Sequence, residues 1–191
     1  LIPFILVTLI WGTTWIVIRD QLGVVPPSWS VTYRFLLAGL VMLVVAMVRR
    51  EKMNIGADGW RFALLLGFAQ FVMNFNFVYR AEHYITSGLA AVIFALLFVP
   101  NALLGRAFLG HRMSGRFIAG SALAVFGVGL LFANEVKADT SGTGQTLLGI
   151  GLVFCGVLSA STANVMQGTR LGRSLPMAAT LGWAMIMGAS T

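Results

Sequence analysis

Charged side chains are scarce in this chain. They account for 10% of its 191 residues, whereas hydrophobic residues account for 58%. A soluble domain carries about 25% charged residues, so this chain has too few to cover a core of its size, and lipid must be its solvent. The net charge of +7 does not indicate a nucleic-acid partner, because the basic residues lie in short loops between apolar runs, where membrane topology accounts for them.

Acidic residues, cysteine pairs and catalytic motifs are also missing from the apolar runs. The sequence has one cysteine, Cys155, which excludes an internal disulfide and a cysteine metal cluster. No HExxH motif, pair of acids or Ser/His/Asp set lies within a run, so we expect neither an enzyme nor a bound metal or cofactor. A coupled transporter usually carries its proton on a membrane carboxylate. We therefore expect either that coupling resides in helices outside this chain or that transport is facilitative; a loop group such as His83 is a third alternative.

Long apolar runs predict an all-α fold, a polytopic bundle of transmembrane helices. Backbone groups in hydrocarbon must be satisfied within the chain, and about 20 residues of helix cross the bilayer. Both ends of the chain lie inside such runs, so we expect a fragment of a longer protein. The runs are Leu1–Ile18, Trp29–Val48, Phe62–Tyr79, Ile85–Leu109, Phe117–Phe132, Thr146–Met166 and one that starts at Met177.

The loops between these runs carry an alternating charge bias. One set holds nine basic residues, namely Arg49, Arg50, Lys52, Arg61, Arg106, Arg112, Arg116, Arg170 and Arg173. The other set holds three, namely Arg19, Arg80 and Lys137. Because loops rich in Lys and Arg stay in the cytoplasm, we expect a multi-pass protein of the cell inner membrane with Leu1 on the cytoplasmic side.

Glycine and proline recur at a fixed spacing. Gly23, Pro27 and Gly39 return 149 residues later as Gly172, Pro176 and Gly188. Five predicted spans separate the copies, and five is odd, so the second copy enters the membrane from the opposite side. Inverted repeats of this kind are typical of transporters, although three matches in a glycine-rich chain can also arise by chance. We expect a first five-helix repeat over 1–133, a periplasmic linker over 134–145 and the start of the second repeat over 146–191.

Several motifs resemble one transporter family. LIWGTTWIVIRDQLGVVPPSWSVTYRFLLAGL, at residues 9–40, and FNFVYRAEHYITSGLAAVIFALL, at residues 75–97, are similar to the drug/metabolite transporter superfamily, and specifically to EamA-type transporters. The resemblance implies ten helices in two inverted five-helix repeats, of which this chain holds about seven. It also implies transport of amino acids, other metabolites or drugs, mostly outward in bacteria. The chain departs from the family in having Pro100 two residues after the usual position, and His111 where Glu is usual.

Polar and aromatic side chains inside the spans are the candidates for a binding site, because a polar group within a membrane faces protein or water rather than lipid. In the first span Thr14 and Trp15 are the primary candidates and Trp11 is a secondary one. In the sixth span Asn164 is a candidate, and the offset of 149 pairs it with Trp15. The alternative for the tryptophans is a helix interface or the membrane surface.

The third and fourth spans supply the remaining primary candidates. Gln70 and Asn74 are four residues apart and share a face of an α-helix; their amides can bind a substrate or bond neighbouring helices. Asn101, beside a proline that should bend the fourth span, completes the set. Phe94 and Phe98 are secondary candidates, and we expect them to share a face with Asn101.

Arg34 is a further secondary candidate in the second span. It can hold a substrate carboxylate at the outer vestibule, or reach the headgroups or a helix carbonyl. Together these features predict a secondary transporter for amino acids or drug-like metabolites that works by alternating access, with export expected. Its partners are a small-molecule substrate and the lipid bilayer, and a homodimer stays open. The alternative is a membrane scaffold or channel component, although no filter motif is present.

Overall fold

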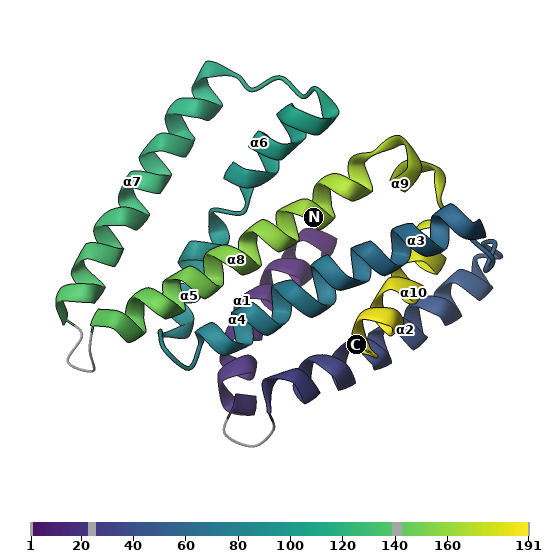
Figure 1. Cartoon of the computed structure of the whole chain (residues 1–191), viewed down its shortest axis with the longest axis horizontal. Helices are drawn as coiled ribbons and strands as arrows, with labels where there is room; N and C mark the ends of the chain where they lie inside the picture. The colour runs from purple at the N-terminus through teal and green to yellow at the C-terminus, as the bar shows by residue number, and fades with distance from the viewer. Residues whose placement is uncertain (1, 23–25, 139–142, 191) are drawn as a thin grey trace.

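The computed structural model describes residues 2–22, 26–138 and 143–190, and within these ranges every regular element is a helix (Figure 1). A π-helical segment, η1, interrupts the third span. In chain order the elements are α1 (Ile2–Leu22), α2 (Pro27–Val48), α3 (Gly56–Gly67), η1 (Phe68–Asn74), α4 (Phe75–Ala81), α5 (Ser87–Ala95), α6 (Phe98–Leu109), α7 (Gly115–Ala138), α8 (Thr143–Gly168), α9 (Arg170–Ser174) and α10 (Met177–Ala189).

The apolar helices match the predicted spans. Two short apolar stretches, Phe4–Thr14 on α1 and Met177–Ala189 on α10, correspond to the first and last runs. Large apolar side chains are exposed on the bundle, as a surface in lipid requires. The prediction of an all-α polytopic membrane protein is therefore confirmed. Five stretches are long and apolar enough to cross a bilayer, namely Ser28–Val48, Gly56–Ala81, Ser87–Leu109, Gly115–Ala133 and Gly144–Gly168.

Glycines bring α10 into close contact with α2. A methyl group built on Gly39 would lie 3.0 Å from the carbonyl oxygen of Gly182 and 2.8 Å from the side chain of Ile186. One turn further along α2, Leu43 lies against Gly182. Residue numbers therefore fall along α10 as they rise along α2, and the two helices run antiparallel.

The loop between α2 and α3 anchors the start of α10. Glu51 accepts a hydrogen bond of 3.0 Å at Oε2 from the backbone N–H of Ala179. This carboxylate satisfies one of the free N–H groups at a helix start, where the helix dipole also favours negative charge. Trp183 donates its Nε1 proton to the carbonyl oxygen of Met53 at 3.1 Å, and its ring centre lies 5.0 Å from that of Trp60. These contacts fix α10 beside α2 and α3.

The contact between α3 and α10 has no room for a side chain at Gly67. A methyl group there would overlap the carbonyl oxygen of Ala184, and one on Gly188 would lie 2.8 Å from the carbonyl oxygen of Gly67. Without a hydrophobic effect between helices in lipid, close backbone approach of this kind is a main source of helix association.

We expect Gly67→Ala to lower the stability of the protein by about 1–3 kcal/mol, because a backbone carbonyl cannot move aside as a side chain can. Gly127→Ala is the matched control, since nothing lies within 4 Å of a methyl group at Gly127. Thermal unfolding of the purified full-length protein in detergent measures both changes. Equal melting temperatures for the two variants would contradict the packing described here.

Candidate substrate-binding site

Helix α8 is the shared wall of the candidate site. It packs against η1, α4, α5 and α6, and Figure 1 shows it between α6 and the span formed by α3 and α4. A methyl group on Gly149 would lie 2.7 Å from Ile85, and one on Gly156 would lie 3.1 Å from Val78. Helix α8 thus holds the third and fourth spans together.

The fourth span is broken where the sequence predicted a bend. Helix α5 ends at Ala95 and α6 starts at Phe98, so the break at Leu96 lies four residues before Pro100. Proline has no N–H to donate to the carbonyl of Leu96; instead, the N–H of Val99 donates to it at 2.9 Å. Pro100 then sits in the first turn of α6, where its missing donor costs least.

The break separates Phe94 on α5 from Phe98 and Asn101 on α6, although we expected all three on one face. The ring of Phe94 lies 6.3 Å from that of Trp11 on α1. Phe98 meets Phe117 on α7 edge to face, with the ring centres 5.9 Å apart. Asn101 instead faces α8. The prediction that all three share a face is wrong for Phe94, because the α-helical step of 100° per residue does not continue through the break. Phe98 and Asn101 lie three residues apart on α6, on neighbouring sides of that helix.

Asn101 and Asn164 meet across α6 and α8. The Nδ2 atom of Asn164 lies 3.4 Å from Oδ1 of Asn101, at the long end of a hydrogen bond. Asn164 is exposed and Asn101 is half-buried. The pair keeps the Nδ2 group of Asn101 and the Oδ1 atom of Asn164 available, so it offers one amide donor and one acceptor to a ligand.

Gln70 and Asn74 both lie on the π-helical segment. Asn74 is 2% exposed and packs against Gly156 of α8, where its Oδ1 would lie 3.4 Å from an added methyl group. Oδ1 of Asn74, Oε1 of Gln70 and Oγ of Ser161 on α8 are buried without a partner among the described residues. Buried polar atoms are normally paired, and π-segments are frequent at functional sites. The π-segment was not predicted from the sequence, since it has no signature at α-helical spacing.

The candidates on α1 and α2 are arranged differently. The Thr14 hydroxyl donates to the carbonyl of Ile10 on its own helix at 2.7 Å. Trp15 lies on α1, but its side chain is outside what the structure describes. The Arg34 guanidinium lies 5.5 Å from the ring centre of Phe75, a cation–π contact. Among the described residues, the ring contacts of Arg34 do not join it to Asn101 or Asn164.

Comparison with known proteins identifies the family of this chain. The model of the EamA-like transporter family matches residues 1–133. The chain belongs to the EamA-like transporter family. The EamA-like match covers the helices from α1 to most of α7, which include every candidate except Asn164.

Curated relatives of this EamA-like chain are similar over the same region. Protein PagO of Salmonella typhimurium is 29% identical over 139 residues, which are 73% of this chain and 46% of PagO. A probable amino-acid metabolite efflux pump of Escherichia coli is 28% identical over 134 residues, or 70% of this chain and 42% of the pump. An uncharacterized transporter of Buchnera aphidicola is 21% identical over 136 residues, or 71% of this chain and 45% of that protein. The chain thus spans less than half the length of these relatives, and no solved structure matches it.

If the full-length protein transports a substrate through this site, we expect Asn101→Ala and Asn164→Ala each to lower the transport rate about fivefold, the effect of losing one hydrogen bond of about 1 kcal/mol. The double variant should lose little more than either single variant, because the two amides act as a pair. Initial rates in reconstituted vesicles measure this. Thr162→Ala on α8 is the control, since its exposed hydroxyl bonds only its own helix, at Leu158. An effect of Asn164→Ala no larger than that of Thr162→Ala would remove Asn164 from the site.

Proposed function

We propose that this chain is part of a secondary transporter that moves small polar metabolites, amino acids above all, out of the cell across the bacterial inner membrane. The asparagine pair Asn101–Asn164 carries the proposal. Asn101 belongs to the first predicted repeat and Asn164 to the second, and Asn101 lies beside the break in the fourth span. Among the described residues, the pair leaves an amide donor and an acceptor free. Amides can bind an ammonium or a carboxylate group without a net charge in the membrane. The name of the Escherichia coli relative, an amino-acid metabolite efflux pump, supports the same substrate class.

Alternating access between two inverted repeats is the proposed mechanism. The antiparallel course of α2 and α10 supports it, since the offset of 149 residues makes these helices equivalent and an inverted copy must run the other way. Residues 1–133 then form the first repeat and 146–191 the start of the second. The linker over 134–145 includes the last residues of α7 and the first residues of α8. The charge bias of the loops supports a cytoplasmic location for the start of α1.

The substrate binds among neutral groups in this proposal. The primary candidates Thr14, Trp15, Gln70, Asn74, Asn101 and Asn164 include no ionisable side chain, so the substrate must bring its own compensating charges, as a zwitterion does. A single buried charge at this depth would cost about 2.5–3.5 kcal/mol. The same reasoning places any proton-carrying carboxylate outside these residues.

Efflux from liposomes tests the function. The full-length protein is reconstituted, the liposomes are loaded with a panel of amino acids, and release is followed with the proton gradient present and collapsed. We expect at least one amino acid to leave faster than from protein-free liposomes, and to leave more slowly with Asn164→Ala. Persistence after the gradient collapses identifies facilitated transport, whereas loss identifies proton coupling. If nothing on the panel moves, the proposal is wrong and a scaffold role replaces it.

A further inference from the structure

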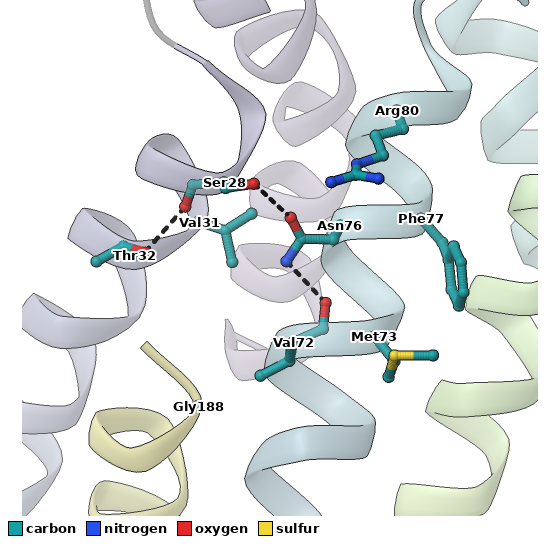
Figure 2. A pocket seen from close by; sticks show the side chains of 9 residues that line it. All are labelled: Ser28, Val31, Thr32, Val72, Met73, Asn76, Phe77, Arg80 and Gly188. Carbon is teal, nitrogen blue, oxygen red and sulfur yellow. Dashed lines mark hydrogen bonds between the residues drawn. The ribbon is translucent and has the colours of Figure 1, made fainter. Parts of the chain in front are cut away.

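Two pockets, each lined by apolar side chains together with one arginine, lie towards the two ends of the span formed by α3, η1 and α4. The outer pocket has a volume of about 350 Å³ and is bordered by α2, η1, α4 and Gly188 of α10 (Figure 2). The inner pocket has a volume of about 330 Å³ and is bordered by α3, α8, α9 and α10. Both are large enough for a small metabolite. Neither contains Asn101 or Asn164, so both are separate from the candidate site.

The two pockets use equivalent positions of the repeat. The outer pocket is lined by Ser28, Val31 and Thr32 in the first turns of α2. The inner pocket is lined by Met177, Thr180 and Leu181 in the first turns of α10. Each of these three positions is shifted by the same 149 residues that relate the glycines and prolines. One pocket therefore corresponds to the other on the opposite side of the membrane.

In the outer pocket Ser28 and Asn76 are hydrogen-bonded, whereas the positive charge of Arg80 has no acidic partner among the described residues. Ser28 donates its hydroxyl proton to Oδ1 of Asn76 at 3.0 Å, and Asn76 donates Nδ2 to the carbonyl of Val72 at 2.8 Å. Figure 2 shows Arg80 one turn above Asn76. Its guanidinium is exposed and forms no salt bridge with an acid in the described part of the chain. The acid nearest in sequence, Glu82, is buried and accepts a hydrogen bond from Ser87.

The inner pocket repeats this composition with different residues. Arg173 of α9 is exposed and likewise has no acidic partner among the described residues. Gln167 supplies the amide, and its Nε2 lies 3.4 Å from the carbonyl of Ala163. Thr180 is 4% exposed, and its hydroxyl is buried without a partner in the described chain. Thr180 and Arg173 line the same pocket, and an unpaired buried hydroxyl there favours a ligand that accepts hydrogen bonds.

We propose that the two pockets are equivalent vestibules, each of which binds a carboxylate of the transported substrate, through Arg80 on the outer side and Arg173 on the inner side. This proposal rests on the transport function proposed above. A guanidinium binds a carboxylate through two parallel hydrogen bonds, and a single positive charge at a pocket mouth raises the local concentration of an anion. The amides between the vestibules carry no charge, so the arginines select the carboxylate before it reaches them.

Cysteine labelling tests the vestibules without requiring transport. Positions 32 and 181 are equivalent, and Thr32→Cys and Leu181→Cys are introduced separately into the full-length protein in which every native cysteine, Cys155 included, is replaced by serine. The proteins are placed in phosphatidylcholine nanodiscs, where both membrane sides are accessible. Labelling rates are measured with an anionic and a cationic methanethiosulfonate reagent, each normalised to its rate with a free thiol.

We expect Arg80→Gln to slow the anionic reagent about threefold at position 32 and to speed the cationic reagent by a similar factor, the effect of one nearby charge in a water-like medium. Position 181 should not change. Arg173→Gln should change both labelling rates in the same way at position 181 and leave position 32 unchanged. Each variant is therefore the control for the other. Rates that do not depend on these arginines would overturn the proposal, even if the protein transports amino acids.

Acetate and acetamide, compared at equal ionic strength, test the carboxylate. We expect acetate to slow labelling at both positions, and acetamide to have no effect, because the two molecules have the same shape and differ in charge. A second set of nanodiscs contains phosphatidylglycerol. If that lipid slows labelling and acetate does not, the pockets bind lipid headgroups and the vestibule proposal is wrong. The labelling result is independent of efflux, so failure of the vestibules and failure of the transport function can be told apart.

Discussion

The absence of water from the bilayer core governs this structure, because every backbone N–H and C=O group within it must bond inside the protein. An unbroken α-helix meets this demand most simply. The chain departs from it at two places within the spans, the π-segment Phe68–Asn74 and the break at Leu96. Irregular backbone at membrane depth is tolerated only where it is covered by protein or lines a cavity. Both departures contact α8 and carry or adjoin candidate residues, so the backbone and the side chains indicate the same region.

The spans could be predicted from the sequence because they depend on hydrophobic length and on proline and glycine. Some of their ends could not: the third span starts at Gly56 rather than Phe62, and α7 continues to Ala138 rather than ending at Phe132. Met177 was expected to start a helix, and α10 starts there. The break before Pro100 was also expected from the missing N–H. The direction of each side chain past the break could not be predicted, because it depends on how α6 packs against α7 and α8. Phe98 consequently contacts α7, whereas Asn101 faces α8.

Tertiary contacts account for what else the sequence did not reveal. No periodicity indicates that Glu51 binds the first turn of α10, since 128 residues separate it from Ala179. Arg34 was singled out because it is a charge within a span, and it lies over the ring of Phe75. Arg80 was counted only as a loop charge, although it lines a pocket. Cations at helix ends cost less to keep in a membrane protein than cations within a span, so their role in a pocket does not show in the sequence.

The distribution of charge along the α3–η1–α4 span gives the proposed transporter a physical logic. Phe62 and Leu66 of this span border the inner pocket, Gln70 and Asn74 lie in its middle, and Arg80 borders the outer pocket. Its two ends therefore adjoin cations, and its centre presents neutral amides. A strong positive charge at the centre would bind a carboxylate too tightly to release it, and would itself be costly in lipid. With one cation at each end, a carboxylate meets a positive charge from either side, and the centre has only to orient the substrate. Because one span contacts all three places, a shift of that span against α8 would change access to both vestibules together, as alternating access requires.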